Sequence, residues 1–394
     1  MTNLKKKFLD LGRQPLANNY LESLSKKEFF YKLEVTYNFT NNLVSLTNFI
    51  KPKYMFNEKY PYRSSMSKTM QKSSKKLSIF LKKKFNCKKI LEIGSNDGLF
   101  LKNFSRSIRI GVEPCKNFST ITNRINIKTY NSFWNLKLAE KLKKKYNSFN
   151  IIYSANTISH IHDLDETFKS IEILLEKKSI FIIDDPSMLK VLQNNSYDQF
   201  YDEHAYVFSL TSLKKLISKH NLEIFNVIKL NTHGGSNRVF ICKKNSRKIN
   251  NNVARYINEE KKFGIDKFST YVKFAKRVKK SKKNLLKIFN KIKKNKKIII
   301  GYGATAKSST VLNYCNINKN HIKYFIDTTK EKGSKLTPGS HIPIINQYCK
   351  INDDVDYAFL GAWNFEKEIT LKENEFIKRG GKFITHIPFP RVFP

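Results

Sequence analysis

The chain has 394 residues, more than one ordinary hydrophobic core accommodates, so we expect two or three domains. Its hydrophobic fraction of 40% and aromatic fraction of 13% are typical of a globular protein and exclude a disordered one. No apolar run approaches the roughly 20 residues that span a bilayer, so we predict no membrane partner.

The net charge of +42 is the most unusual feature of the composition. A basic surface favours nucleic acid, but the excess here is lysine, which recognises phosphate less specifically than arginine does. It also accompanies many asparagines and isoleucines, as in proteins from AT-rich genomes. We therefore predict no nucleic-acid partner. The basic N-terminus is not followed by an apolar segment, so we expect a cytoplasmic protein, and we expect it to be a monomer.

The cysteines are scattered and have no paired spacing, which predicts reduced thiols and neither a disulfide framework nor a metal site. They are Cys87, Cys115, Cys242, Cys315 and Cys349.

The first predicted domain covers residues 1–66 and is too short to be stable without docking on its neighbour. Short apolar segments lie at residues 31–37 and 43–46. Near its end, Tyr60 and Tyr62 flank a proline, and two tyrosines at this spacing can line one side of an extended segment. Packing within a turn is the simpler alternative to a role in binding.

Residues 89–100 have the pattern of a strand, a glycine-rich turn and the start of a helix. Glycines in such a turn let a ligand approach the backbone, because no Cβ intervenes. The spacing Glu-x-Gly-x-x-x-Gly is neither the dinucleotide fingerprint nor a P-loop, and a tight turn without a ligand is the alternative. The candidate binding residues of this turn are Glu92, Gly94, Asn96, Asp97 and Gly98.

The next predicted strand, residues 108–112, ends at Glu113. A nucleotide-binding α/β unit places a carboxylate for ribose hydroxyls at this position, about 20 residues after the first turn. A solvated strand end is the alternative, but the pairing with the glycine turn favours ribose binding.

Residues 67–245 alternate between helical and strand patterns, which predicts a parallel sheet covered by helices. Two further strand patterns, residues 222–230 and 237–243, predict an antiparallel hairpin at its edge. The predicted parallel strands are 89–93, 108–112, 126–130, 149–154 and 178–184, and the predicted helices are 67–85, 99–105, 115–123, 134–146 and 164–175.

Polar residues follow the last two parallel strands, where ligands of such sheets bind. Asn156 and His160 follow the fourth strand, and Asp184 ends the fifth. Asn156 and His160 are four residues apart and share a face if the segment is helical, although a helix cap or a solvated side chain would have the same pattern.

The segment Tyr201-Asp-Glu-His204 brings a phenol, a carboxylate and an imidazole within four residues. A carboxylate can hold the tautomer of an imidazole and support its charge, which predicts a general base formed by Glu203 and His204. A hydrogen-bonded aromatic loop is the alternative. Further on, Arg238 could hold a phosphate or a substrate oxygen, or could be a surface charge at a strand end.

Residues 246–296 predict a lysine-rich helical connector whose apolar stripe packs on the rest of the protein. The last domain, residues 297–394, opens with a strand, a turn containing Gly301 and Gly303, and a helix start carrying Lys307. Backbone N–H groups and a lysine at a helix start predict an anion site, such as one for phosphate.

Together these segments resemble the S-adenosylmethionine-dependent sugar C-methyltransferases, over nearly the whole chain. The matching patterns are LG-x-x-PLAN-x-YL at residues 11–21, N-x-x-x-H-I-x-D at 156–163, Y-x-E-H-x-x-x-F-S at 201–209, HGGS-x-R at 233–238, GYGA-x-x-K at 301–307, PG-x-x-IP at 338–343 and W-N-x-x-x-E-I at 363–369. The resemblance implies an α/β fold: a class I methyltransferase Rossmann-like sheet in the centre, a small N-terminal domain, and a second Rossmann-like domain at the C-terminus.

The N-terminal domain of this family is a zinc-binding type with a cysteine pair before its last strand. In this chain that pair falls on Asn38 and Asn41, and no cysteine precedes Cys87. An asparagine amide does not replace a thiolate on zinc, so we expect this domain to form without metal.

The resemblance also implies a function: methyl transfer from S-adenosylmethionine to a carbon next to the ketone of a nucleotide-linked 4-keto-deoxysugar. The central domain would hold S-adenosylmethionine, and the C-terminal domain would help to hold the nucleotide. Tyr201, Glu203 and His204 would be catalytic, His160 the rival base, and Tyr60, Tyr62 and Asn156 would contact ligands. An O- or N-methyltransferase, a nucleic-acid methyltransferase and a lapsed binding protein are the alternatives.

Overall fold

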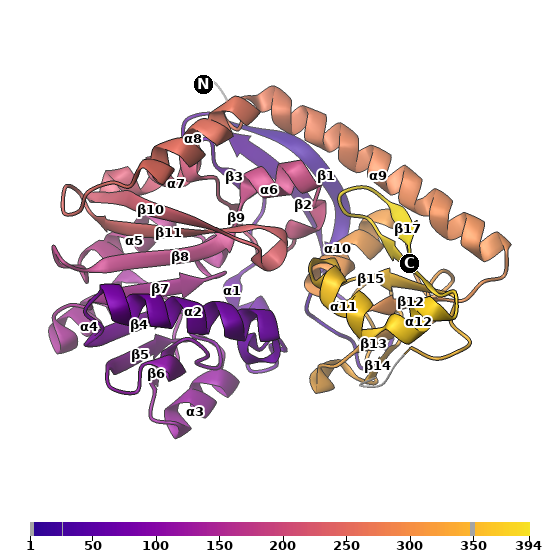
Figure 1. The fold of residues 1–394 in the computed structure, drawn as a ribbon, viewed down its shortest axis with the longest axis horizontal. Helices are drawn as coiled ribbons and strands as arrows, with labels where there is room; N and C mark the ends of the chain where they lie inside the picture. Colours follow the sequence, from indigo (N-terminus) through magenta and orange to yellow (C-terminus); the bar gives the residue numbers. More distant parts are fainter. Residues whose placement is uncertain (1–3, 26, 347–350) are drawn as a thin grey trace.

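The computed structural model describes residues 4–25, 27–346 and 351–394, which form three sheets (Figure 1). The central and C-terminal sheets lie side by side, the N-terminal strands lie above and between them, and the long helix α9 (Phe268–Lys294) runs from these strands over the top of the C-terminal part. Cys349 lies outside the described residues, and the other four cysteines are free thiols.

The N-terminal sheet is antiparallel with the order β1-β2-β3-β9. Its strands are β1 (Lys5–Pro15), β2 (Phe30–Asn38), β3 (Val44–Leu46) and β9 (Tyr206–Val207). The fourth strand comes from the central part of the chain and directly follows the segment 201–204. The N-terminal sheet therefore includes residues beyond the predicted range 1–66 and holds one end of that segment.

The turn between β2 and β3 carries Asn38 and Asn41. Oδ1 of Asn38 accepts hydrogen bonds from two backbone N–H groups of the turn (2.8 and 3.3 Å), and Oδ1 of Asn41 accepts one from Leu43 (3.1 Å). Beside the turn, the ring of Tyr37 packs on that of Tyr271 in α9, with centroids 4.6 Å apart. Side-chain amides thus close the turn, and docking on α9 supplies apolar contacts that a short sheet cannot make by itself.

The central sheet has the order β10-β11-β8-β7-β4-β5-β6, in which a parallel sheet ends in an antiparallel hairpin, as predicted. Its strands are β4 (Lys89–Ile93), β5 (Ile108–Val112), β6 (Lys128–Tyr130), β7 (Ile151–Ala155), β8 (Ile180–Pro186), β10 (Leu222–Leu230) and β11 (Ser236–Lys243). The helices of this part are α1 (Pro52–Met55), α2 (Lys68–Lys84), α3 (Lys116–Arg124), α4 (Leu136–Tyr146), α5 (Leu164–Glu172), α6 (Met188–Asn194) and α7 (Leu210–Ile217).

The helix predicted at residues 99–105 is wrong, because only one 3₁₀ turn, η2 (Leu101–Asn103), forms there. Nδ2 of Asn103 donates to the carbonyls of Leu99 and Phe100 (both 3.1 Å), which would otherwise accept backbone bonds of a helix. A side chain that bonds locally to the backbone competes with helix formation in this way.

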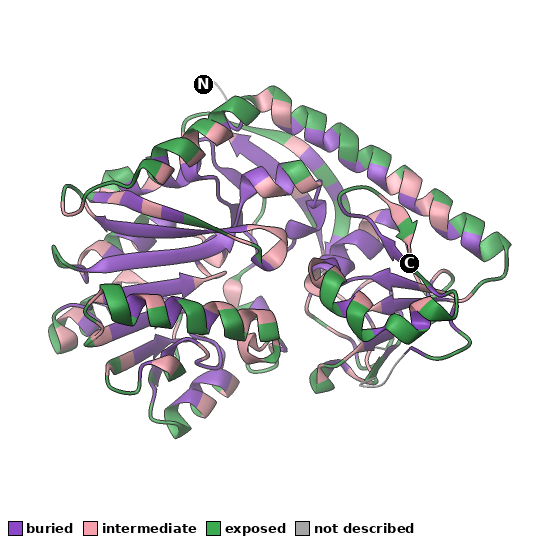
Figure 2. Cartoon of the chain, viewed as in Figure 1, coloured by how far each residue is buried: buried purple, intermediate pink, exposed green. Residues whose placement is uncertain are grey.

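The connector consists of two helices, α8 (Asn251–Phe263) and α9, separated at Gly264. Gly264 has φ +87°, a left-handed conformation that favours glycine and ends α8. Along α9, buried and exposed residues alternate (Figure 2), and the predicted stripe, including Phe274 and Leu285, is buried. Helix α9 packs on β1 at one end and on the C-terminal domain at the other.

The C-terminal sheet has the order β14-β13-β12-β15-β16-β17, parallel except for its last strand. Its strands are β12 (Ile299–Tyr302), β13 (Phe325–Asp327), β14 (Ile344–Asn346), β15 (Tyr357–Leu360), β16 (Lys382–Thr385) and β17 (Arg391–Phe393). Its helices are α10 (Ala306–Cys315), α11 (Glu366–Lys372) and α12 (Asn374–Lys378).

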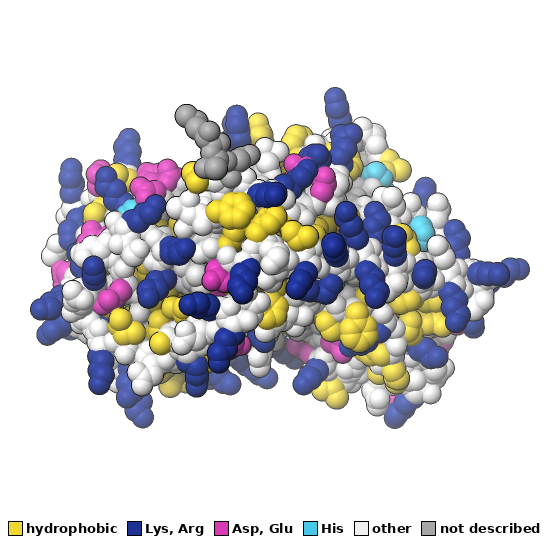
Figure 3. Space-filling model, turned by 90° about the horizontal axis from the view of Figure 1, so that it is seen from above, with side chains coloured by type: hydrophobic (Ala, Val, Ile, Leu, Met, Phe, Trp, Pro, Cys, Tyr) yellow, Lys and Arg dark blue, Asp and Glu magenta, His cyan; other side chains and the backbone are white. Residues whose placement is uncertain are grey.

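On the face seen from above, lysine and arginine side chains are spread among neutral and apolar ones and form no single stripe (Figure 3). Within the described residues, no helix is both long enough and apolar enough to cross a membrane.

Candidate active site

A cavity of about 1020 Å³ lies where the three sheets meet. The N-terminal region contributes Asn18, Tyr60 and Tyr62 to its lining; the central domain contributes Gly94, Asn96, Glu113, Asn156, His160, Tyr201, Glu203, His204 and His233; and the C-terminal domain contributes Gly303, Thr305, Lys307, Lys332 and Asn364. Most of the residues predicted from the sequence therefore line one cavity. The exceptions are Glu92, Asp97, Gly98, Arg238 and Gly301.

The glycine turn after β4 forms one end of the cavity. Gly94 has φ +72°, and a Cβ there would lie 2.1 Å from Oγ1 of Thr157, so glycine alone fits against the end of β7. The two carboxylate oxygens of Glu113 accept the N–H groups of Asn96 (2.8 Å) and Cys115 (2.9 Å). Each oxygen keeps a further acceptor position, and burial raises the pKa of Glu113.

S-adenosylmethionine fits this end by the chemistry of its residues. Glu113 offers acceptors for ribose hydroxyls, Gly94 brings the backbone close, and the rings of Phe133 and Trp134 line the same cavity as apolar faces for an adenine.

Three residues predicted as cofactor contacts lie behind the turn. A Cβ on Gly98 would lie 2.9 Å from the side chain of Thr122, so this glycine serves packing. Glu92 is buried below the turn, and burial raises its pKa well above the usual range. Oδ2 of Asp97 accepts the N–H of Ser65 (3.3 Å) and thereby ties the segment after Tyr62 to the turn.

Asn96 has the same tying role as Asp97 while also lining the cavity. Its Oδ1 accepts the N–H of Ser64 (2.9 Å), and its Nδ2 donates to the carbonyl of Tyr62 (3.0 Å). These bonds hold Tyr60 and Tyr62 over the cavity, where the sequence predicted substrate contacts.

Tyr201 and His204 form a hydrogen-bonded pair in the wall of the cavity. Nε2 of His204 lies 2.8 Å from the Tyr201 hydroxyl, and Nδ1 lies 2.7 Å from the carbonyl of Gln199. A carbonyl only accepts, so Nδ1 carries the proton and the lone pair of Nε2 accepts the hydroxyl of Tyr201. Burial lowers the pKa of His204 well below its usual range, which keeps the imidazole neutral.

Glu203 does not hold His204, contrary to the prediction. Its carboxylate oxygens accept hydrogen bonds from Nδ2 of Asn18 (2.6 Å) and from the hydroxyl of Tyr60 (2.8 Å). The tautomer of His204 is instead set by the backbone of Gln199. Burial raises the pKa of Glu203, and the carboxylate positions Tyr60 against the cavity.

His160 lies beside His204, with ring centroids 5.2 Å apart, and stacks on Phe56. Burial lowers the pKa of His160 to about 3. Nδ2 of Asn156 lies 3.3 Å from Nε2 of His233, in the loop between β10 and β11. The sequence pattern covered His233 but did not single it out as a site residue.

Arg238, predicted as a substrate contact, lies outside the cavity lining. Its Nε and Nη2 donate to the two carboxylate oxygens of Asp184 (2.8 and 2.6 Å), and Tyr153 donates to the same carboxylate (2.9 Å). The guanidinium thus ties β11 to β8. The strand-end position of Asp184 was visible in the sequence, but its pairing with Arg238 was not.

In the C-terminal domain, the two glycines of the turn after β12 have different roles. Gly301 lies under the ring of Phe325, where a Cβ would come within 2.4 Å, and it does not line the cavity. Gly303 has φ +81° and lines the cavity against Ala362. Lys307, in the first turn of α10, is buried and lines the same wall, and burial lowers its pKa to about 8.

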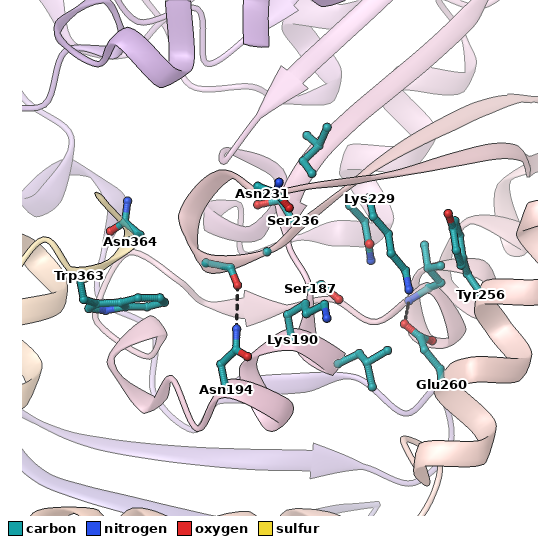
Figure 4. A pocket seen from close by; sticks show the side chains of 16 residues that line it. Ser187, Lys190, Asn194, Lys229, Asn231, Ser236, Tyr256, Glu260, Trp363 and Asn364 are labelled. Carbon is teal, nitrogen blue, oxygen red and sulfur yellow. Dashed lines mark hydrogen bonds between the residues drawn. The ribbon is translucent and has the colours of Figure 1, made fainter. Parts of the chain in front are cut away.

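A second, smaller cavity of about 490 Å³ lies on the other side of the loop between β10 and β11 (Figure 4). Nδ2 of Asn194 donates to the carbonyl of Gly234 across it (3.0 Å), and Trp363 and Asn364 form its far wall. Asn364 also lines the large cavity, so the two cavities share a wall residue.

Zinc does not fit the N-terminal domain of this chain. Among the described residues no group of three or more His, Cys, Asp or Glu side chains could hold a metal ion. At the turn after β2, the amides of Asn38 and Asn41 are used in backbone hydrogen bonds.

A parallel sheet closed by an antiparallel hairpin, with a glycine turn and a carboxylate at successive strand ends, defines a class I S-adenosylmethionine-dependent methyltransferase. Family comparison agrees: residues 62–227 match "Methyltransferase domain", residues 231–388 match "C-methyltransferase C-terminal domain", and residues 1–56 match "Putative zinc binding domain".

The chain is 30% identical to the C-methyltransferase NovU of Streptomyces niveus over 392 residues, which cover 98% of this chain and 93% of NovU. The chain therefore belongs to the family of S-adenosylmethionine-dependent C-methyltransferases. Solved structures cover less. A methyltransferase from Clostridium acetobutylicum matches 46% of this chain and 94% of its own (12% identity, TM-score 0.35), and one from Thermotoga maritima matches 45% and 89% (21% identity, TM-score 0.36).

Proposed function

We propose that the protein methylates a carbon next to the ketone of a nucleotide-linked 4-keto-deoxysugar. One observation carries the proposal: a single cavity joins the Gly94 turn, the Tyr201–His204 pair and the start of α10. A methyl donor, an acid–base pair and a nucleotide-linked acceptor can therefore meet in one space. Holding both reactants in line supplies a large part of the rate of such a transfer.

His204 is the base in this proposal. A proton next to a ketone is weakly acidic, so it needs a neutral acceptor close by and a stabilised enolate. His204 meets the first need through Tyr201: the phenol oxygen takes the substrate proton as its own proton passes to the lone pair of Nε2. His160 is the rival: burial lowers the pKa of both imidazoles, but among the described residues no phenol or other group bonds to Nε2 of His160.

The substrate would lie between the tyrosines of the N-terminal region and the C-terminal domain. Tyr60 is fixed by Glu203 and faces the cavity, and Asn156 lines it from the end of β7. Gly303 and Lys307 line it from the C-terminal side. Bound at Gly94 and Glu113, S-adenosylmethionine supplies an electrophilic methyl group on a sulfonium.

A proton-exchange assay tests this function. The protein is incubated in D₂O with a panel of nucleotide-linked keto sugars, and NMR follows the proton next to the ketone; a labelled methyl donor then follows transfer. We expect exchange and transfer with at least one member of the panel. No exchange and no transfer with any member would refute the substrate class.

Variants of the two histidines identify the base. His204→Asn should lower exchange and transfer by about 10²-fold or more, because a positioned general base contributes this much, while calorimetry shows that both ligands still bind. His220→Asn is the matched control, since His220 pairs with exposed Asp165 away from the cavity. If His160→Asn loses exchange and His204→Asn keeps it, the two roles are reversed.

A further inference from the structure

Lys307 is a buried cation that the fold leaves without a hydrogen-bond partner. The residue is 8% exposed, and among the described residues none accepts a hydrogen bond from its Nζ. Lys332 of the same cavity is equally buried, at 9% exposed, but its Nζ donates to the carbonyl of Ala304 (2.7 Å) and to Asp327 (3.2 Å). A buried ammonium without an acceptor is costly, so a free one in a cavity wall points to a ligand.

Lys307 lies close to Trp363 and within electrostatic reach of the Tyr201–His204 pair. Its Nζ lies 5.4 Å from the ring centroid of Trp363, whose indole N–H donates to Asp198. The positive charge of Lys307 contributes to the lowered pKa values of both His204 and His233, so it lies within electrostatic reach of both imidazoles. The ammonium lies in the lining of the cavity that also holds these imidazoles.

The start of α10 is less suited to a phosphate than the sequence predicted. Oγ1 of Thr305 accepts the N–H of Ser308 (3.1 Å), and Oγ of Ser308 accepts the N–H of Thr305 (2.9 Å). This capping box uses two donors that a phosphate at the helix start would need. The ammonium of Lys307 carries a single positive charge, which matches one oxygen with a single negative charge better than a diphosphate.

We propose that Nζ of Lys307 binds the ketone oxygen of the substrate and stabilises the enolate that forms there. This inference rests on the proposed function. When the C–H bond next to the ketone breaks, its proton goes to the oxygen of Tyr201 as the hydroxyl proton of Tyr201 passes to Nε2 of His204. The electron pair of the C–H bond forms the enolate, whose negative oxygen pairs with the ammonium. On methyl transfer the electron pair forms the new carbon–carbon bond, the carbonyl is restored, and the methyl–sulfur bond leaves its pair on sulfur.

The decisive experiment separates the ketone oxygen from the phosphates. Lys307→Met removes the charge at similar length, and exchange of the proton next to the ketone is followed in D₂O without a methyl donor. Calorimetry measures binding of the matching nucleoside diphosphate, which has no sugar. We expect saturating exchange to fall by about 10²-fold or more, as for loss of an oxyanion donor, with nucleoside diphosphate affinity changed less than about threefold.

Two further variants sharpen the result. Lys307→Arg keeps the charge and should exchange faster than Lys307→Met. Lys367→Met removes an exposed lysine of α11 that does not line the cavity, and should leave both readouts unchanged. Circular dichroism confirms the fold of each variant.

Three outcomes would overturn the inference. If Lys307→Met weakens nucleoside diphosphate binding more than tenfold and keeps exchange at saturation, Lys307 contacts phosphate. If neither readout changes, the ammonium has no role in the reaction. If the unmodified protein exchanges no proton of any nucleotide-linked keto sugar, the proposed function is wrong and the inference falls with it. If the unmodified protein exchanges the proton and Lys307→Met does not, the proposed function stands and the inference is supported.

Discussion

Removing the charge of Lys307 should make the protein both more stable and less active. Burial lowers the pKa of this lysine from its ordinary 10.5 to about 8, although the charge of Asp198 raises it. Holding the ammonium in the folded protein at pH 7 therefore costs about 3 kcal/mol relative to the unfolded chain. Methionine keeps the length and apolar character of the stem, so we expect Lys307→Met to raise the free energy of unfolding by about 2–3 kcal/mol at pH 7.

The pH dependence gives this prediction a distinct signature. Between pH 8 and 10.5 the unfolded lysine holds a proton that the folded one has lost, so the stability of the unmodified protein rises with pH relative to the variant. His204 and His233 have lowered pKa values and stay neutral over this range. The stability gap seen at pH 7 should therefore close by more than half at pH 10.

Urea unfolding at pH 7 and pH 10 measures both effects, with Lys367→Met as the control for loss of an exposed charge. The control should change stability by less than about 0.5 kcal/mol at either pH. Two results would refute the conclusion that the ammonium of Lys307 is unpaired in the folded protein. One is a Lys307→Met variant less stable than the unmodified protein at pH 7; the other is a stability difference between them that does not shrink at pH 10.

Three further predictions concern the cofactor end and the N-terminal domain. Glu113→Ala should weaken S-adenosylmethionine binding by about 1.5–3 kcal/mol in calorimetry, since a charged acceptor of ribose hydroxyls is lost, and an unchanged affinity would contradict this role. Gly94→Ala should also weaken S-adenosylmethionine binding and should lower the free energy of unfolding by about 1–2 kcal/mol or more. The reason is that an alanine at φ +72° is strained and its Cβ would clash with Thr157. Unchanged binding and an unchanged melting temperature would contradict this role of Gly94. The purified protein should hold no stoichiometric zinc and keep its fold in a chelator, because Asn38 and Asn41 occupy the cysteine positions; elemental analysis that finds one zinc per chain would overturn this expectation.

The parallel strands were predictable because burial on both faces leaves a continuous apolar run in the sequence. Residues 180–183 of β8 are all apolar and all buried, and the turn after β4 was recognisable from Gly94. The failure at residues 99–105 has a local cause, since Asn103 takes the carbonyls that a helix would use. An asparagine four residues into an apolar segment does not reveal this in advance, because its side chain can equally point to solvent.

Local motifs identified much of the cavity, but not the partners of its residues. Tyr201 and His204 form a hydrogen bond within one turn, although the sequence predicted Glu203 as the partner of His204. Glu203 bonds to Asn18, 185 residues away in the sequence, and Arg238 bonds to Asp184 on a neighbouring strand. Such pairings depend on how the sheets are arranged in space, and the spacing of residues along the chain does not predict that arrangement.

The arrangement of those partners explains why three domains are needed for one site. The segment from Asp198 to β9 belongs to the central domain and is held by the other two. From the N-terminal domain, Ala17 donates its N–H to Asp202 (2.9 Å); from the C-terminal domain, Thr310 of α10 donates to the carbonyl of Phe200 (3.1 Å) and the indole of Trp363 donates to Asp198.

The N-terminal domain thus acts on the site through hydrogen bonds and through β3, which pairs with β9. Neither link uses a metal ion, because both are made by protein hydrogen bonds: the backbone pairing of β3 with β9 and the bond from the N–H of Ala17 to Asp202. A chain that lost the zinc ligands of that turn would still hold Tyr201 and His204 in place, provided that the turn closes by other means. The amide hydrogen bonds of Asn38 and Asn41 and the docking of Tyr37 on α9 close it here.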